Sequence, residues 1–507
     1  MIASTLNNKL LGGGLLLAFC LLIPLSAHAG YFEFTPEARI AYKKAIHLRF
    51  DEARTLIQQI KVKDPDNLIV YQIENYIDFF TIFLNENKQE FKELEKNKSY
   101  RLDRISEGDR DSPYYLYAEA EIKLQWALAR LKFEEYFKAF NEVRSAYKLL
   151  NKNLKKFPEF KASKKSLGIL HALVGTIPDQ YKWGVKLLGG MDGTVEQGRR
   201  EIEEVLEYAT HNDFVFEEET IVMYALLMLH LNNQGETAWD LVRTDKLDPD
   251  VNPLASFVLA NVAMHTGRND EAIRILENRP TDPAFHPFPY LEYMLGLSKL
   301  YRLETGAASH FQHYLTHFRG QNYIKEAYQK LAWLALIHGD EQQYYTLIQN
   351  CRNKGAALIG GDKNAEKEAK TGLVPHPQLL RARLLFDGGY HQKAYQLLQT
   401  APAAQFRTAR ARLEYQYRLG RITHQLNRIE EAQQYYQQTY EEGRKEPYYF
   451  ACNAALQMGL LFEEQQDYYR ARSYYKLCLG LRPDEYRNSL HQKAKAGLNR
   501  LKGRKAG

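Results

Sequence analysis

The chain has 507 residues, of which 45% are apolar and 26% charged, and its formal net charge at pH 7 is +6. Together with a mean hydropathy of −0.50, this composition excludes a polytopic membrane protein, while the apolar fraction suffices for a large core. So small a net charge on so long a chain gives no indication of a nucleic-acid partner. The length suits two or three conventional domains or one elongated repeat array.

The first 29 residues have the layout of a secretory signal peptide. Lys9 supplies the positive charge, Leu10 to Leu25 form the apolar segment, and Ala27-His28-Ala29 is a small-x-small cleavage site. We therefore expect an exported mature chain, periplasmic or in the cell envelope and possibly secreted. The alternatives are a lipid anchor at Cys20 and an uncleaved anchor helix.

Pairs of small residues twelve positions apart recur along the mature chain. This spacing is typical of the tetratricopeptide pattern, a helix-turn-helix of about 34 residues with small residues where its two helices touch. A large side chain at that point would hold the two helices apart. The pattern predicts an all-α, tetratricopeptide-like α-solenoid of antiparallel helix pairs. The pairs are Ala41 and Ala53, Ala260 and Ala272, Gly296 and Ala308, Ala382 and Ala394, Gly420 and Ala432, and Gly459 and Ala471.

The mature chain divides by composition into four parts. Residues 30–160 are expected to form N-terminal helical repeats, and residues 161–350 a central segment with further repeats. Residues 351–377 are rich in glycine, lysine and proline and are predicted to be a linker. Residues 378–507 are expected to hold the C-terminal repeats and a closing helix.

The central segment from Ser166 to Val205 is not an ordinary repeat, because glycines and a proline interrupt two short apolar helices. It resembles the signature region of the tetratricopeptide repeat protein 39 family, also called the inclusion-body-clearance family. The C-terminal stretch DEYRNSLHQKAKAGLNRL is similar to the closing helix of that family. The resemblance implies a non-enzymatic helical-repeat protein with no catalytic residues to carry over. Familiar members are intracellular, unlike a chain with an export signal. The residues that carry the resemblance are Gly168, Pro178, Leu187, Leu188, Gly189, Gly190, Gly193 and Gly198.

Three histidines in the stretch SHFQHYLTHF are the best candidates for metal ligands. Offsets of three and seven residues place His310, His313 and His317 on one helical face, and imidazole is a common zinc ligand. However, Ala308 marks the contact between helices in the repeat register, which turns these histidines toward solvent. We therefore predict an exposed stripe without bound metal, and no cofactor elsewhere.

The chain contains 35 tyrosines, many of them in the C-terminal repeats. Most are expected to fill the space between helices with their hydroxyl groups at the rim. The alternative is a concave groove lined by aromatic and arginine side chains, which would suit an extended peptide. The positions facing such a groove are Arg383, Tyr417, Arg421 and His424. Arg383 and Arg421 each follow a small residue, so a basic ladder is predicted.

Three cysteines remain after removal of the leader. Cys351, Cys452 and Cys478 form no CxxC motif, have irregular spacing and give an odd total. A disulfide framework is therefore not expected even in an oxidising compartment, and at most one pair forms.

Two hypotheses of function follow. The first is an exported, non-enzymatic scaffold that binds a protein or peptide through its concave face, without a transmembrane span once the leader is removed. The second is a helical-toroid enzyme that acts on an envelope polysaccharide or another polymer through carboxylates in a central cavity. Overall shape distinguishes them, because the small-residue interval belongs to open solenoids rather than closed toroids.

Overall fold

The computed structural model describes residues 29–176, 190–231, 234–502 and 504. Over these ranges the chain forms 24 α-helices and one short 3₁₀-helix without any β-strand, which confirms the all-α fold class. Most of the predicted leader lies outside the described residues, as do Pro178, Leu187, Leu188 and Gly189 of the family-like segment.

Most helices form consecutive pairs in which each helix packs against the next. The pairs are α1 (Pro36–Ile46) with α2 (Phe50–Lys63), α3 (Ile69–Asn85) with α4 (Lys88–Ser106), α5 (Pro113–Lys132) with α6 (Tyr136–Lys156), α7 (Lys161–Gly175) with α9 (Val195–His211), α10 (Glu217–Leu231) with α11 (Gly235–Val242), α12 (Pro253–His265) with α13 (Asn269–Asn278), α14 (Tyr290–Tyr301) with α15 (Ala307–His317), α16 (Ile324–Ile337) with α17 (Glu341–Asn353), α19 (Pro377–Asp387) with α20 (His391–Gln399), α21 (Ala409–Gln425) with α22 (Ile429–Gly443), and α23 (Phe450–Glu464) with α24 (Tyr468–Gly480). Two further helices, α18 (Gly360–Thr371) and α25 (Arg487–Arg500), stand outside this pairing.

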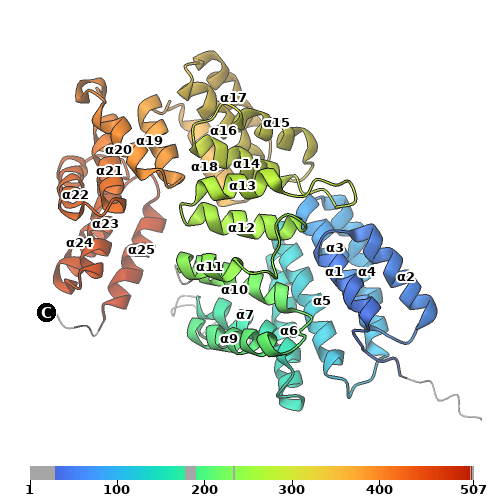
Figure 1. Ribbon diagram of the computed structural model, residues 1–507. Helices are drawn as coiled ribbons and strands as arrows, with labels where there is room; N and C mark the ends of the chain where they lie inside the picture. The colour runs from blue at the N-terminus through green and yellow to red at the C-terminus, as the bar shows by residue number, and fades with distance from the viewer. Residues whose placement is uncertain (1–28, 177–189, 232–233, 503, 505–507) are drawn as a thin grey trace, which may run out of the picture.

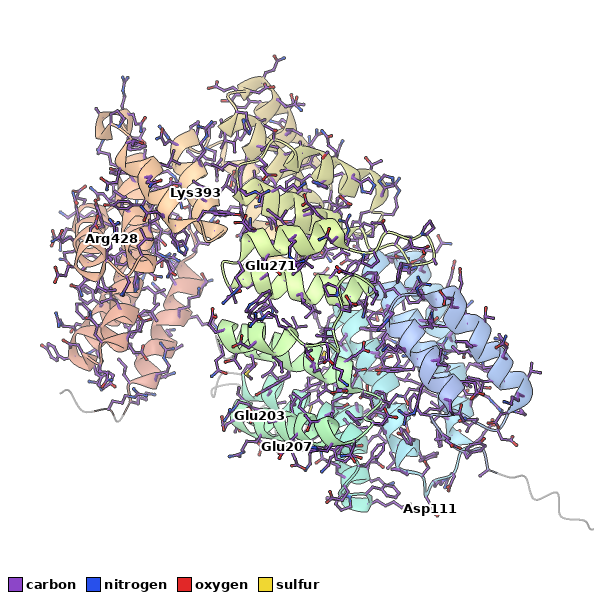
Figure 2. The ribbon with its side chains drawn as sticks, viewed as in Figure 1. Asp111, Glu203, Glu207, Glu271, Lys393 and Arg428 are labelled. Carbon is purple, nitrogen blue, oxygen red and sulfur yellow. The ribbon has the colours of Figure 1, made fainter. Side chains whose placement is uncertain are left out.

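The first helices of the pairs contact one another along most of the chain and form one layer, and the second helices form the other. Figure 1 shows the result, an open arch in which the N-terminal helices and the C-terminal helices lie on opposite sides. Charged residues are exposed on second helices, such as Glu207 on α9 and Lys393 on α20 (Figure 2). The second helices therefore form the solvated outer face.

The small-residue interval is found in the structure with one refinement. Ala432 and Ala471 are fully buried, but the glycine of each pair faces a tyrosine rather than the alanine. A Cβ atom on Gly459 would lie 2.6 Å from the ring of Tyr475, four residues after Ala471. The first helix needs a small residue because the tyrosine ring of the second helix occupies the space beside it.

The predicted interval is wrong by one residue in the pair α14–α15. Ala307 is fully buried, whereas Ala308 is only partly buried. Gly296 faces the ring of Phe311, which lies four residues after Ala307, and a Cβ there would be 3.2 Å away. Helix α15 begins at Ala307 itself, whereas Ala272 and Ala432 lie three residues inside α13 and α22, so the buried alanine falls at a different place in the second helix.

The predicted linker, residues 351–377, contains a packed helix. Helix α18 contacts α16 and α17, and its residue Asp362 is completely buried. The Asp362 carboxylate accepts hydrogen bonds from the backbone N–H groups of Tyr323 (2.7 Å) and Glu326 (3.0 Å) at the start of α16. The amino-acid composition of this segment predicted a linker because few of its residues are apolar. Composition does not reveal that one acidic residue, Asp362, is buried and holds the helix in place. The division of the chain into four parts stays a prediction.

The N-terminal pairs contact the middle of the chain directly. The backbone N–H of His286 donates to the carbonyl of Leu48 (2.7 Å), and its ring stacks on Phe50 with the centroids 4.7 Å apart. The Glu86 carboxylate accepts hydrogen bonds from the backbone (3.0 Å) and the side chain (2.8 Å) of Asn322. In Figure 1 the loop between α13 and α14 accordingly reaches the end of α3. The arch is thus braced by contacts between distant parts of the sequence.

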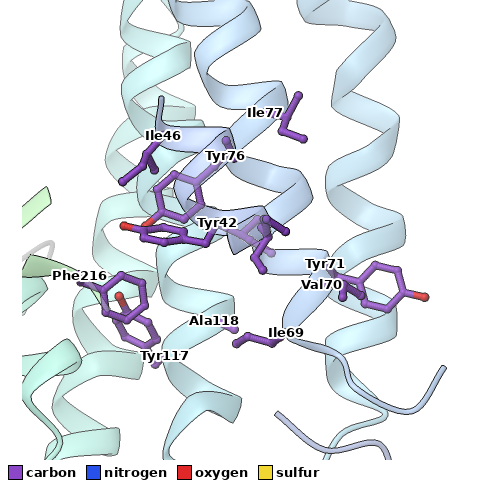
Figure 3. Packing of buried hydrophobic residues seen from close by; sticks show 14 of the residues in the cluster. Tyr42, Ile46, Ile69, Val70, Tyr71, Tyr76, Ile77, Tyr117, Ala118 and Phe216 are labelled. Atoms are coloured by element: carbon purple, nitrogen blue, oxygen red, sulfur yellow. The ribbon is translucent and has the colours of Figure 1, made fainter. Parts of the chain in front are cut away.

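The N-terminal core is rich in tyrosine. Tyr42, Tyr76 and Tyr117 pack together with Phe216 (Figure 3). The hydroxyls of Tyr42 and Tyr76 donate to the Glu219 carboxylate at 3.0 and 2.6 Å. These two hydroxyls therefore bind a partly buried carboxylate. They do not lie at the rim, where the sequence places the hydroxyls of most tyrosines.

Candidate functional site

A cavity of about 320 Å³ lies on the inner face of the C-terminal pairs. The first helices α19, α21 and α23 form its walls, and α18 and the beginning of α25 complete it. Its lining combines aromatic rings with guanidinium, amide and ammonium groups. It is the candidate functional site because it brings together most of the residues that the repeat register predicts for the groove.

Arg383, Tyr417 and Arg421 all line the cavity, whereas His424 does not. His424 lies one turn beyond Arg421, where its Nδ1 is 3.4 Å from the Tyr436 hydroxyl, and burial lowers its pKa. The His424 Nε2 also lies 3.9 Å from the carboxylate of Glu464 on α23. His424 thus lies beside the cavity without lining it, and its role in a partner-binding groove stays a prediction.

Arg383 has its charge compensated within the protein. Its Nε is 3.5 Å from the carboxylate of Asp387, one turn along α19. Its guanidinium lies over the ring of Trp333, 4.8 Å from the centroid. Arg383, the first residue of the predicted basic ladder, is thus paired with a carboxylate of its own helix and with an indole from α16. It therefore contributes less positive charge to the cavity than expected.

Arg421 differs, because no carboxylate of the described chain lies within 4.0 Å of its guanidinium nitrogens. The guanidinium lies over the ring of Phe386, 4.9 Å from the centroid, and Nη1 donates to the Tyr417 hydroxyl at 3.0 Å. A largely buried guanidinium has five N–H donors, and a single hydroxyl leaves most of them without a strong acceptor. Arg421 is therefore free to hold an anion.

The Tyr417 hydroxyl is arranged as a donor. Its ring is buried, and its oxygen accepts hydrogen bonds from Arg421 and from the side-chain amide of Asn453 (2.6 Å). Since a phenol oxygen has two acceptor positions and one proton, these two bonds leave the proton to be donated. Arg421 and Tyr417 together present donors that require an acceptor.

Several lining residues were not singled out from the sequence. Asn453 lies on α23 and could have been found by extending the register to the next first helix. Tyr486 and Lys493 lie around the start of α25, and Tyr486 packs edge-on against Tyr449 with the centroids 5.0 Å apart. These two positions depend on how α25 folds back over α23, which no repeat register specifies.

The cavity has an excess of positive charge. Arg418 is paired with Glu414 on its own helix, and Arg383 is paired with Asp387. Lys493, like Arg421, forms no ion pair with any described carboxylate. The cavity therefore suits a ligand that carries carboxylates or carbonyl oxygens.

The three candidate metal ligands are not equivalent. His310 is half-buried and its Nδ1 lies 2.7 Å from the Glu292 carboxylate of α14, which corrects the expectation that it faces solvent. His313 and His317 are exposed, with ring centroids 4.0 Å apart. The one-residue change of register at Ala307 explains the difference. Among the described residues, no group of three or more His, Cys, Asp or Glu side chains is placed to hold a metal ion; the absence of a bound metal stays a prediction.

Of the helices that the structure describes, none combines the length and the apolar character needed to cross a membrane.

Comparison with known proteins identifies the class of repeat. The tetratricopeptide repeat family model matches residues 413–441 and 453–485, which correspond to α21–α22 and α23–α24. The matched repeats contribute Tyr417, Arg418, Arg421, Ile422 and Asn453 to the lining of the cavity. No match is found among curated protein sequences.

A comparison with solved structures returns chains that share little sequence with this one and superpose poorly on it. Yeast Tom70 is 14% identical, with 85% of this chain and 89% of that chain covered and a TM-score of 0.30. Naa15/Naa10 bound to HypK-THB is 16% identical, with 92% of this chain and 66% of that chain covered and a TM-score of 0.24. The P58(IPK) TPR domain is 15% identical, with 84% of this chain and 100% of that chain covered and a TM-score of 0.21. The resemblance to the tetratricopeptide repeat protein 39 family stays a prediction.

Proposed function

We propose that the chain is an exported, non-enzymatic scaffold that binds a protein or peptide partner through the inner face of its C-terminal repeats. The match of α21–α24 to tetratricopeptide repeats supports a role in protein interaction. The cavity between α19, α21, α23 and α25 supports this face as the binding surface.

One observation carries the proposal: apart from the bond to the Tyr417 hydroxyl, the N–H groups of Arg421 have no strong acceptor at the cavity, and the Tyr417 proton is left to be donated. An acidic side chain or a terminal carboxylate of an extended peptide would supply one, and Lys493 would add a second positive charge. The rings of Phe386 and Tyr449 would contact the apolar parts of the same peptide. The ligand is therefore an extended peptide segment with at least one carboxylate.

The test is a crosslinking pull-down from cell-envelope extract with the wild type and Arg421→Gln. Removal of the charge should reduce recovery of the bound partner by about tenfold or more, because a central charged contact typically contributes 2 kcal/mol or more. Arg428→Gln is the matched control, since Arg428 precedes α22 on the outer face and lies over the ring of Tyr395, 4.3 Å from the centroid. Equal recovery with Arg421→Gln and the wild type would reject the cavity as the binding site.

Export is a separate part of the proposal. Cleavage after Ala29 would leave Gly30 and Tyr31 at the new N-terminus, where the Tyr31 backbone N–H donates to the carbonyl of Asp66 at 2.8 Å. N-terminal sequencing of the protein from native cells should therefore begin at Gly30. A chain found uncleaved in the cytoplasm would contradict export but leave the binding proposal standing.

A further inference from the structure

Two cysteines that play no part in the cavity lie next to each other in the last pair of helices. Cys452 is in the first turn of α23 and Cys478 in the last turn of α24, and their sulfur atoms are 3.5 Å apart. Both thiols are free and completely buried. The third cysteine, Cys351, belongs to a different hydrophobic cluster, with Trp333 and Tyr344, so it cannot compete for either partner.

The separation of the two sulfur atoms is close to what a covalent bond needs. A disulfide bond is about 2.05 Å long, so the sulfur atoms must approach by roughly 1.5 Å. Cysteine side chains on two adjacent, antiparallel helices can make this movement through small rotations and shifts. The Cys452 sulfur also lies 3.4 Å from the carbonyl oxygen of Cys478, which shows that the two helices are already close at this point.

We propose that Cys452 and Cys478 form an intramolecular disulfide when the chain meets a disulfide oxidant such as oxidised glutathione. One thiolate attacks a glutathione sulfur and releases one reduced glutathione, which gives a mixed disulfide. The second thiolate then attacks the protein sulfur of that mixed disulfide and releases the second glutathione. In the net reaction, two protein thiols are oxidised to one disulfide, and one oxidised glutathione is reduced to two glutathione thiols. The two protons that the protein thiols lose are balanced by the two that the glutathione thiolates take up.

The contact between the two thiols and their burial shift their pKa values: the pKa of Cys452 is lowered and that of Cys478 is raised. Attack by either thiolate leads to the same disulfide. Because both sulfurs are buried, the oxidant reaches them through local opening at the end of the array, where α25 covers α23 and α24 and has no further helix beyond it among the described residues.

The bond would fasten the end of the arch. It joins α23 to α24 directly, and the Cys478 sulfur also lies 3.9 Å from the carbonyl of Leu490 in α25. Oxidation should therefore restrict the opening of α24 and α25. This consequence goes beyond partner binding and holds whether or not the cavity binds a peptide.

The test compares disulfide equilibrium in the folded and the unfolded chain. The full chain is equilibrated in mixtures of oxidised and reduced glutathione, with and without denaturant, then quenched with acid, alkylated and mapped by mass spectrometry. We expect one crosslinked peptide joining Cys452 to Cys478, with Cys351 remaining alkylatable. The equilibrium constant for its formation should be at least about tenfold larger in the folded chain, a difference of about 30 mV in reduction potential.

Single substitutions make the result specific. Cys351→Ser should keep the crosslink, and Cys478→Ser should abolish it and leave Cys452 as a thiol or a glutathione adduct. A second sample is unfolded and then refolded in the same glutathione mixtures. If the disulfide is missing there as well, slow access of glutathione to the buried thiols cannot be the reason. A constant in the folded chain equal to or below that in denaturant, or a crosslink that uses Cys351, would overturn the proposal.

Discussion

At the residue scale, two glycines surround one tyrosine ring. Gly459 on α23 and Gly497 on α25 both face the ring of Tyr475, and a Cβ on either would contact ring atoms inside normal packing distance. The ring cannot move away from one helix without approaching the other. Gly459→Ala should therefore lower the free energy of unfolding of the terminal helices by about 1–2 kcal/mol, in spite of the better helix propensity of alanine. Urea denaturation followed by tyrosine fluorescence measures this loss.

Two comparisons separate packing from propensity. Gly480→Ala, at the end of α24 with nothing within 4 Å of the added carbon, should change stability by less than about 0.5 kcal/mol. In a Tyr475→Leu background the cost of Gly459→Ala should largely disappear, because the ring that opposes the new methyl group is gone. A cost that is the same in both backgrounds would show that Tyr475 is not the residue the glycine accommodates.

At the scale of elements, α18 is held to α16 by a buried acid. The Asp362 carboxylate accepts two backbone N–H groups at the start of α16. Asp362→Ala leaves both donors buried without a partner, so it should destabilise the docking of α18 by about 1–3 kcal/mol. Hydrogen–deuterium exchange should accelerate at Tyr323 and Glu326, and protease cleavage should increase within residues 351–377.

A cap of the same chemistry on a neighbouring helix provides the control. Asp340 accepts one N–H, that of Gln343 (2.9 Å), at the exposed start of α17. Asp340→Ala should cost about 0.5–1 kcal/mol and leave exchange at Tyr323 unchanged. If Asp362→Ala leaves proteolysis of residues 351–377 as in the wild type, the segment is held by other contacts than this carboxylate.

At the scale of the whole molecule, His286 makes the bracing of the arch sensitive to pH. Burial, with a contribution from Arg54, lowers the pKa of His286 from 6.5 to about 4. Between these values the unfolded chain binds the proton and the folded chain does not, so stability falls as the pH decreases below 6.5 and through 4. His286 should account for about 2 kcal/mol of stability lost between pH 7 and pH 5.

The measurement is the difference in pH dependence between the wild type and His286→Gln, by chemical denaturation from pH 7 to pH 5. Glutamine stays neutral over this range, so the variant should show a flatter profile even if its stability at pH 7 is lower. His313→Gln, which replaces an exposed histidine on α15, should keep the wild-type slope. Parallel profiles for wild type and His286→Gln would contradict the assigned pKa shift.

The sequence alone predicted the helical class and the pairing of helices, and its alternative of an aromatic and basic groove named three residues that line the cavity. The interval from Gly459 to Ala471 reflects packing between two neighbouring helices. Because this packing depends only on residues within one turn of the helix crossing, it is visible in the sequence as a short-range spacing. The same register placed Arg383, Tyr417 and Arg421 on one wall, because equivalent positions in successive repeats face the same side.

Only the tertiary structure decided which charges in the cavity are compensated and how the arch is braced. Trp333 reaches Arg383 from a different pair, α25 brings Lys493 to the cavity, and His286 meets Phe50 across more than two hundred residues. These contacts depend on the small rotation that is added at each repeat. Such rotations accumulate along the whole chain, so no local sequence pattern records where distant side chains meet.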